Sequence, residues 1–237
     1  PFREVVATGP DGSARTLLTT AAPVADPGAP ASAVVRISFD ISRRKEAEEQ
    51  VRYMAEHDSL TGLANRLLFT RRLSHALAEG GLVALHLIDL DDFKDVNDTM
   101  GHAAGDALLM AATGRMRACL KPQDMLARLG GDEFAVVQVG ITTTKEAEAT
   151  AARLARALGA PYAIDGAAIP AGASIGVAIG PGDGVDGPTM LKQADIALYR
   201  AKAAGRGQVR RFSATMAVTL MEQRRLGSDV RQALEDK

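Results

Sequence analysis

The sequence has no tryptophan, a single cysteine and only 4% aromatic residues, and each shortage excludes a class of protein. Because Cys119 has no partner within the chain, the fold is not held by disulfides, and we expect a reducing, cytoplasmic location. Sparse aromatic side chains argue against a surface that stacks nucleic-acid bases. No run of about 18 apolar residues is present, so we expect no membrane span and no direct membrane contact. A net charge of −1 recruits no nucleic acid.

At 237 residues the chain is long enough for one large domain or two small ones with a substantial core. It begins at Pro1 without a signal-like segment, and we expect it to be a piece of a longer protein. Residues 1–41 contain two strand-like stretches, 16–20 and 33–39, separated by a loop rich in proline, glycine and alanine at 21–31. Such a segment cannot form a core alone, so it resembles the end of a truncated domain.

A charged helix is predicted at 43–56, with Asp40 or Ser42 as its cap. Its apolar positions, which include Val51 and Met54, are compatible with a short seam between two helices, and equally with a single solvated helix. Beyond it, strand and helix patterns alternate. We expect strands at 82–90, 125–129, 134–139, 171–179 and 209–212, helices at 103–120, 144–158 and 188–204, and an amphipathic tail at 213–237 with Leu220, Leu226, Val230 and Leu234. Hairpins mixed with crossover helices predict an α+β fold with a mixed sheet.

The most informative segment is Arg128–Phe134, which reads RLGGDEF. Two glycines between short apolar runs predict a tight β-hairpin, because glycine accepts positive φ freely. Asp132 and Glu133 would then project from the turn, where a divalent cation carrying phosphates is a suitable ligand. Taken alone, the same four residues GGDE are more often an ordinary acidic surface turn.

A second acidic cluster, from Asp89 to Asp95, follows the strand at 82–90. Four acids within seven residues cannot all be buried without a nearby cation, and strand ends are where ligands bind in such sheets. Asp89 and Asp132 would meet around a magnesium ion if their strands are neighbours. For Asp91 and Asp92, capping of the next helical turn is an equally good explanation.

Two further pairs have both a functional and an ordinary interpretation. Asn97 and Asp106 offer an amide and a carboxylate that match the hydrogen-bonding edge of guanine, although an ordinary turn and a first-turn helix acid would look the same. Lys202 and Arg206 flank a glycine at a helix end, where positive charge is favourable without any ligand. Beside a nucleotide they would become phosphate clamps.

These motifs occur in one order over residues 58–212, and the sequence resembles the GGDEF-domain diguanylate cyclases. The matching motifs are 58–66 (DSLTGLANR), 89–94 (DLDDFK), 97–98 (ND), 101–106 (GHAAGD), 130–134 (GGDEF) and 194–206 (ADIALYRAKAAGR). The resemblance implies a ferredoxin-like core, similar to the palm of nucleotide cyclases, and condensation of two GTP into cyclic di-GMP with release of two pyrophosphates. It also implies two Mg²⁺ or Mn²⁺ ions in each active site.

The resemblance assigns roles residue by residue. Asp89, Asp132 and the Leu90 carbonyl are the implied metal ligands, and Asp132 and Glu133 the implied catalytic acids. The implied GTP-binding residues are Asn97 and Asp106 on guanine, Lys94, Lys202 and Arg206 on phosphates, with the Phe93 backbone and His102 close by. The identity of the general base is left open.

Attack of one ribose hydroxyl on the other nucleotide requires two domains facing each other, so we expect a homodimer whose geometry is set by the signalling helix at 42–57. Around the cyclase domain, residues 1–41 resemble the end of a PAS sensor domain, and 213–237 a linker towards an EAL phosphodiesterase domain that this chain lacks. An alternative function is a weakly catalytic GTP-binding domain that regulates such an EAL neighbour. A pure dimerisation module would leave Asp89 and Asp132 unexplained.

One departure from the family pattern concerns product inhibition. Many relatives carry an Arg-x-x-Asp site five residues before the signature, and here the corresponding residues are Lys121 to Asp124. Lysine lacks the planar fork with which arginine grips a guanine or phosphate in two places. The sequence therefore predicts weak or absent feedback inhibition.

Overall fold

The structure is a computed structural model that describes residues 2–9, 12–24, 33–164 and 166–219. The chain divides into two compact units, Pro1–Ala55 and Glu56–Lys237. Most of the predicted tail, including Leu220, Leu226, Val230 and Leu234, lies outside the described residues, whereas residues 214–219 are helical. No helix in the described ranges is long and apolar enough to cross a membrane.

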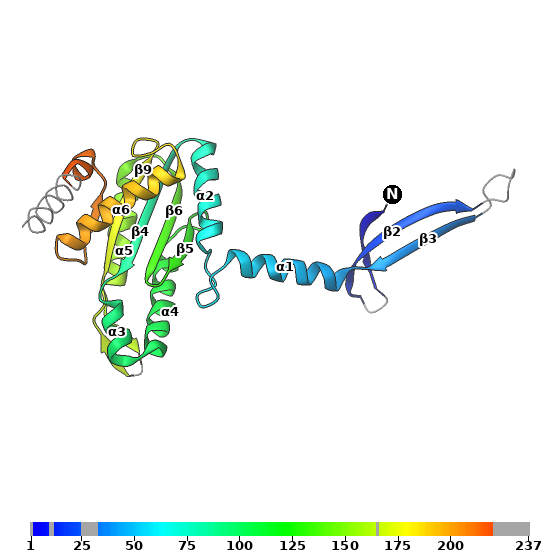
Figure 1. Cartoon of the computed structure of the whole chain (residues 1–237), viewed down its shortest axis with the longest axis horizontal. Helices are drawn as coiled ribbons and strands as arrows, with labels where there is room; N and C mark the ends of the chain where they lie inside the picture. The colour runs from blue at the N-terminus through cyan, green and yellow to red at the C-terminus, as the bar shows by residue number, and fades with distance from the viewer. Residues whose placement is uncertain (1, 10–11, 25–32, 165, 220–237) are drawn as a thin grey trace, which may run out of the picture. The chain divides into compact units, whose positions relative to one another are not determined.

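The first unit holds a three-stranded antiparallel sheet of β1 (Arg3–Thr8), β2 (Ala14–Val24) and β3 (Ala33–Asp40), in the order β1-β2-β3 (Figure 1). Both predicted strands are present, but the expectation of a loop from residue 21 is wrong. Strand β2 continues to Val24 because its backbone pairs with β3 along that whole stretch. Strand β1 was not predicted.

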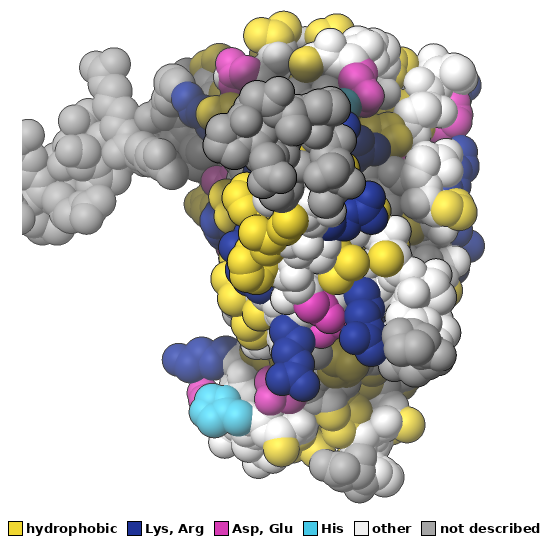
Figure 2. All heavy atoms as spheres, turned by 90° about the vertical axis from the view of Figure 1, so that its right-hand side faces the viewer, with side chains coloured by type: hydrophobic (Ala, Val, Ile, Leu, Met, Phe, Trp, Pro, Cys, Tyr) yellow, Lys and Arg dark blue, Asp and Glu magenta, His cyan; other side chains and the backbone are white. Residues whose placement is uncertain are grey.

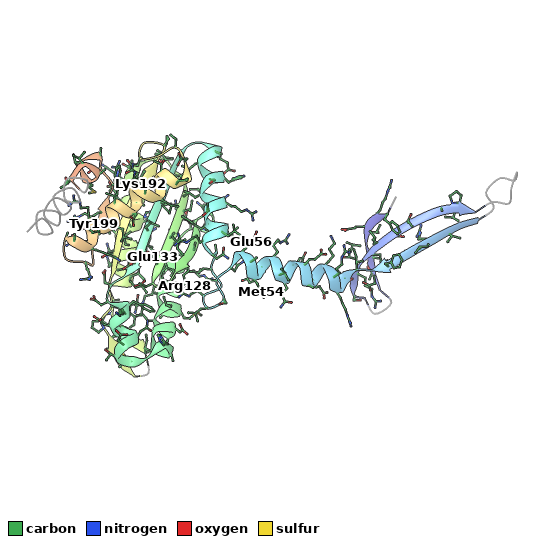
Figure 3. All side chains as sticks on the ribbon, viewed as in Figure 1. Met54, Glu56, Arg128, Glu133, Lys192 and Tyr199 are labelled. Atoms are coloured by element: carbon green, nitrogen blue, oxygen red, sulfur yellow. The ribbon has the colours of Figure 1, made fainter. Side chains whose placement is uncertain are left out.

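Helix α1 (Ser42–Glu56) follows directly and agrees with the predicted helix. Of its two proposed caps, Asp40 caps it: the Asp40 carboxylate accepts a hydrogen bond from the Ser42 amide at 3.0 Å. The Ser42 hydroxyl instead accepts from the Thr16 amide of β2. No residue of α1 is buried, and Val51 is exposed on it. Met54 is exposed as well (Figure 3).

The second unit is built on a five-stranded sheet in the order β10-β9-β4-β6-β5, in which only the β10–β9 pair is parallel. Its elements are α2 (Arg66–Glu79), β4 (Leu82–Leu90), α3 (Phe93–Met100), α4 (His102–Cys119), β5 (Met125–Gly130), β6 (Glu133–Ile141), α5 (Thr144–Leu158), β7 (Tyr162–Ile164), β8 (Ala167–Ile169), β9 (Ala173–Gly180), α6 (Gly187–Ala203) and β10 (Val209–Arg211). The expected α+β architecture, a mixed sheet flanked by helices, is confirmed.

Strand β4 lies at the centre of this sheet, and eight of its nine residues are buried. Its side chains alternate between two cores. Ala84, Ile88 and Leu90 contribute to the core that α4 and α5 cover, whereas Leu85 and Leu87 face the core that α2 and α6 cover. An apolar strand is therefore buried on both faces, as its composition predicted.

The remaining predicted elements are present within two residues of their expected ends. Helices α2 and α3 and the short β7–β8 hairpin were not predicted. Strands of three residues carry too little periodicity to recognise, and α3 is only eight residues long. On the face drawn in Figure 2, basic and acidic side chains are interspersed, in keeping with the near-zero net charge.

A buried polar network crosses from the sheet to α5. His86 on β4 is fully buried, and its Nε2 lies 2.9 Å from Oε1 of Gln138. The Gln138 amide nitrogen donates to the Thr150 hydroxyl, so the Gln138 oxygen must accept and His86 Nε2 carries the hydrogen. Burial, together with the nearby positive charge of Arg153, lowers the pKa of His86 to about 4, although its bond to Gln138 opposes the shift.

This depressed pKa predicts an acid-sensitive fold. The unfolded chain protonates His86 near pH 6.5 and the folded chain only near pH 4, so stability falls as the pH drops through that window. The expected loss is about 3 kcal/mol on the unfolding free energy. Urea titrations at several pH values should show that His86→Gln removes most of this loss. Exposed His75→Gln is the matched control, and equal pH slopes for His86→Gln and the wild type would contradict the prediction.

Candidate functional site

The RLGGDEF segment forms the predicted hairpin between β5 and β6, but its turn lies one residue later than expected. Gly130 still pairs with Glu133 in the ladder, so the two turn residues are Gly131 and Asp132. Gly130 and Gly131 both have positive φ, 146° and 54°, which explains why two glycines are needed. Asp132 therefore stands at the tip of the turn.

Asp89 lies near the end of β4, directly opposite Glu133 on β6 and Ser174 on β9. Its side chain is only 10% exposed, and its Oδ2 atom is 2.6 Å from Nζ of Lys202. Burial raises the pKa of Asp89; the ion pair with Lys202 opposes this, and the neighbouring charges of Asp132 and Asp91 add to it. The site therefore concentrates negative charge that one lysine only partly neutralises.

The three proposed metal-binding residues come together at this point. The Leu90 amide donates to the Asp132 carbonyl at 3.3 Å, which ties the hairpin turn to the end of β4. Among the described residues, no group of three or more histidine, cysteine or acidic side chains is arranged to hold a metal ion. The oxygen donors and crowded negative charge nevertheless fit a hard divalent cation. Such a cation would offset both the burial that mainly raises the pKa of Asp89 and the repulsion from Asp132 and Asp91 that adds to it.

Asp91 and Asp92 do not cap α3 with their side chains, so that alternative is wrong. Asp92 occupies the N-cap position in a left-handed conformation (φ 58°) and makes no capping hydrogen bond through its side chain. Asp91 is buried and accepts hydrogen bonds from Ser174 and Gly207 instead. Both acids therefore turn towards the loop that follows α6.

The proposed nucleotide-reading residues lie on α3 and α4. Phe93, Lys94 and Asn97 are on α3, and His102 and Asp106 are on α4. The two helices meet at Gly105, where a Cβ atom would lie 2.0 Å from Oδ1 of Asn97 and 3.3 Å from the ring of Phe93. Only glycine leaves room for Asn97 here. Asp106 is the next residue on α4 and is exposed.

Of the three proposed phosphate-binding residues, Lys94 lies on α3 and the other two reach the acidic strand end. Lys202, in the last turn of α6, pairs with Asp89, and Arg206 Nε lies 3.7 Å from Oδ1 of Asp92. Their charges therefore act at the site and not only on the helix terminus. The structure brings Asp89, Leu90, Asp132, Glu133, Lys202 and Arg206 to one end of the sheet, with the α3–α4 residues continuing from β4.

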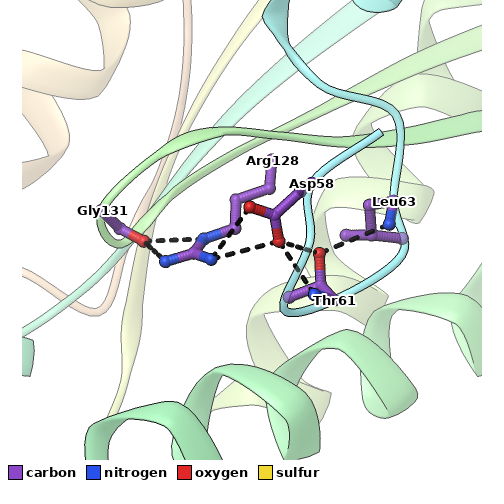
Figure 4. A network of polar contacts seen from close by, with 5 residues as sticks. All are labelled: Asp58, Thr61, Leu63, Arg128 and Gly131. Atoms are coloured by element: carbon purple, nitrogen blue, oxygen red, sulfur yellow. Dashed lines mark hydrogen bonds and ion pairs between the residues drawn. The ribbon is translucent and has the colours of Figure 1, made fainter. Parts of the chain in front are cut away.

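Arg128 and Asp58 form a clasp that was not predicted (Figure 4). Arg128 donates from Nε and Nη2 to the Gly131 carbonyl, at 2.9 and 2.8 Å, and from Nη1 to both Asp58 oxygens. Asp58 also accepts from Thr61. Partial burial would raise the pKa of Asp58, but the bonds from Thr61 and Arg128 outweigh it and lower the pKa. The clasp thus joins the segment after α1 to the hairpin turn.

Glu133 has a partner that was also not predicted. Arg66, the first residue of α2, lies 3.6 Å from its carboxylate. Both residues line a cavity of about 360 Å³ between α2 and α6, together with Lys192, Asp195 and apolar side chains that include Leu87. Arg66 is the last residue of the 58–66 motif, and that motif is the sequence signal from which a role for Arg66 could have been predicted.

Comparison with known proteins decides the family. Residues 55–208, more than half of the chain, match the family described as "Diguanylate cyclase, GGDEF domain". The chain belongs to the GGDEF family. This is a family of nucleotidyltransferase-type cyclases that act in cyclic di-GMP signalling.

The most similar proteins support this assignment. An uncharacterized signaling protein of Caulobacter vibrioides is 45% identical over 202 residues, covering 83% of this chain but 25% of that protein. The structure of the GGDEF domain of Pseudomonas aeruginosa TpbB is 38% identical (TM-score 0.68; 70% of this chain, 99% of that one). The coiled coil and GGDEF domain of Caulobacter crescentus DgcB, in complex with c-di-GMP, is 30% identical (TM-score 0.66; 72% and 93%).

The chain spans about a quarter of the length of the first curated relatives that it matches. Their names differ in activity. Some are diguanylate cyclases, one is a bifunctional cyclase and phosphodiesterase, and others are cyclic di-GMP phosphodiesterases. The GGDEF domain is therefore shared by longer proteins with different overall functions.

The proposed degenerate inhibitory site lies away from the hairpin, on another cavity of this GGDEF domain. Lys121 and Asp124 line a space of about 440 Å³ together with His57 and Arg117. The Asp124 carboxylate accepts from the Lys121 amide at 3.0 Å, so the four-residue turn closes on itself. A cavity is thus present, but Lys121 occupies the position at which an arginine would donate two hydrogen bonds at once.

We predict that Lys121→Arg strengthens binding of cyclic di-GMP about tenfold or more, because guanidinium bonds a guanine or phosphate edge in two places. Isothermal titration calorimetry with cyclic di-GMP measures this, and Lys145→Arg on α5 is the matched control. Submicromolar binding by the wild-type chain that depends on Lys121 would contradict the prediction of weak feedback inhibition.

Proposed function

We propose that this domain condenses two GTP molecules into cyclic di-GMP, releasing two pyrophosphates, and that it does so as a homodimer with Mg²⁺ or Mn²⁺, two ions per active site. One observation carries the proposal: Asp89 and Asp132 meet at the end of β4, where Lys202 and Arg206 also reach the acidic side chains. A nucleoside triphosphate requires acidic side chains that bind its cations and basic side chains that bind its phosphates.

Asp89, Asp132 and the Leu90 carbonyl would hold the metal ions, which when bound activate the attacking hydroxyl and neutralise the departing pyrophosphate. In the structure, Nζ of Lys202 forms an ion pair with Oδ2 of Asp89 at 2.6 Å. In the loaded site we propose that Lys202 turns to the phosphates, joined there by Lys94 and Arg206. Glu133 is assigned to the reacting centre because it lies directly opposite Asp89.

Guanine recognition is proposed for Asn97 and Asp106, with Phe93 and His102 beside the nucleotide. The close fit of Asn97 against Gly105 supports this role, because it restricts the amide to few orientations. A preorganised amide and carboxylate select the guanine edge over adenine, whose donors and acceptors are placed differently. GTP is therefore the proposed substrate.

Dimerisation is proposed through α1. A single domain holds one nucleotide, so both halves of the reaction come from two copies. Val51 and Met54, three residues apart on α1, are 62% and 61% exposed and would form part of a seam with the same helix of a second copy. In the longer protein, we propose that residues 1–41 end a PAS-like sensor and that 213–237 lead towards an EAL domain.

The test is to incubate purified protein with GTP and MgCl₂ and to identify products by mass spectrometry over a range of protein concentrations. We expect cyclic di-GMP and pyrophosphate, with specific activity rising with protein concentration as dimers form. Failure to form any cyclic di-GMP at high concentration, with GTP still bound, would reject the cyclase.

That outcome would favour the second candidate, a GTP-binding domain that regulates a neighbouring EAL domain. The observation behind it is that two longer relatives are named cyclic di-GMP phosphodiesterases. The intact Asp132 and Glu133 favour the cyclase, because a purely regulatory domain has no need of both acids.

A further inference from the structure

The loop between α6 and β10 has an unusual backbone. Gly205, Arg206 and Gly207 follow one another with φ angles of 110°, 61° and 59°. Arg206 is one of only two non-glycine residues with positive φ in the described part of the chain. For a residue with a side chain, this backbone conformation costs about 1 kcal/mol or more of conformational free energy, and it persists only where neighbouring contacts hold it.

Asp91 supplies such a contact. Its side chain is buried, with the residue 5% exposed, and its Oδ2 atom accepts a hydrogen bond from the Gly207 amide at 2.9 Å. Its Oδ1 atom accepts from the hydroxyl of Ser174, a fully buried residue of β9, at 2.8 Å. Its own amide donates to the Gly172 carbonyl at 3.0 Å. Asp91 therefore joins the end of β4, the start of β9 and the loop after α6.

The chemistry of this contact favours a carboxylate. Each oxygen faces a donor, and both bonds are strengthened by the negative charge. An asparagine could still accept from Gly207 and donate its NH₂ group to the Ser174 hydroxyl, but both bonds would then be neutral and weaker. Space is also limited, since a Cβ at Gly172 would lie 3.4 Å from Oδ2 of Asp91 and 4.0 Å from the Cα of Gly207. The three chain segments pack so closely that a displacement of Asp91 would also displace the loop between α6 and β10.

We propose that Asp91 is a positioning residue that holds Arg206 in place for the phosphate groups of the bound nucleotide, through Gly207. Arg206 immediately precedes the amide that Asp91 binds, and its guanidinium faces Asp92, the residue after Asp91. Asp91 itself, committed to Ser174 and Gly207, has no part in ligand contact. The inference rests on the proposed function only in taking phosphate as the ligand of Arg206.

The experiment is a double-mutant cycle read by ligand affinity. Inorganic tripolyphosphate with MgCl₂ is titrated by calorimetry into the wild type, Asp91→Asn, Arg206→Ala and the double variant. Asp91→Asn should weaken tripolyphosphate binding by up to about tenfold, because the bond that holds Gly207 loses its charge assistance. In the Arg206→Ala background the same change should have little further effect. The exposed Asp98→Asn is the charge-matched control.

Equal losses of affinity in both backgrounds would mean that Asp91 acts independently of Arg206 and would overturn the inference. A wild type that binds no tripolyphosphate, or an Asp91→Asn variant that binds it normally, would also overturn it. If Asp91→Asn does not fold, Ser174→Ala, which frees one carboxylate oxygen, takes its place in the same cycle with a smaller loss. Product formation is assayed separately, so a coupled cycle without cyclic di-GMP would reject the cyclase and keep the inference.

Discussion

Replacing Asp132 with asparagine is expected to reduce formation of cyclic di-GMP from GTP by about 10³-fold or more, while the fold is retained. Asp132 stands in the hairpin turn, close enough to Asp89 to raise its pKa. The substitution removes one of two carboxylates proposed to bind the metal ions and leaves only Asp89 with the Leu90 carbonyl. Loss of charge stabilisation at a reacting phosphate has effects of this size.

The measurement is the initial rate of cyclic di-GMP formation, followed by chromatography at saturating GTP and MgCl₂. Glu79→Gln, which removes an exposed carboxylate from α2, is the matched control and should react at the wild-type rate. Thermal melts should show the same midpoint for all three proteins. Full turnover by Asp132→Asn would exclude Asp132 as a metal ligand.

Replacing Gly176 with alanine is expected to destabilise the domain by about 3 kcal/mol or more. Gly176 lies in β9 beneath α6, and a Cβ atom there would be 2.2 Å from the Ala194 carbonyl oxygen and 2.3 Å from the Leu198 amide nitrogen. Both are backbone atoms of α6, so the helix itself must move away from the sheet. Overpacking that displaces backbone costs more than the usual 1–3 kcal/mol for an added methyl group.

The control is Gly114→Ala on α4, where nothing lies within 4 Å of the added atom. This change should stabilise the domain by up to about 1 kcal/mol, because glycine is a poor helix former. Urea unfolding compares both variants with the wild type. Since α6 carries Lys202, Gly176→Ala should also weaken GTP binding. Wild-type stability of Gly176→Ala would show that α6 does not pack on β9 as described.

Local chemistry made several elements predictable. Strand β4 is apolar at every position except His86 and Asp89, and further acids follow it. This pattern predicted a buried central strand that ends at a ligand site. Gly130 and Gly131 required positive φ, so the hairpin could be expected, although its turn proved to be Gly131 and Asp132. The register was not readable because a bulge between Arg128 and Gly130 shifts the pairing by one residue.

Contacts between distant residues were not predictable. Asp58 and Arg128 are 70 residues apart, and although each belongs to a recognised motif, nothing in the two motifs indicated that they pair. For Asp91, the sequence left capping of the next helical turn and a place in a cation-binding cluster equally open, whereas its partners Ser174 and Gly207 are 83 and 116 residues away. Side-chain partners at such separations depend on strand order, which no local pattern contains.

The sequence by itself determined the family, the central strand, the glycine hairpin and the identity of the acids, because each depends on residue type and local spacing. The tertiary structure alone decided which groups each acid contacts. Asp89 pairs with Lys202, Glu133 pairs with Arg66, and Asp91 accepts a hydrogen bond from the loop that carries Arg206. The physical reason is that hydrogen bonds and ion pairs act over a few ångströms in space, and only the order β10-β9-β4-β6-β5 brings those groups within that range.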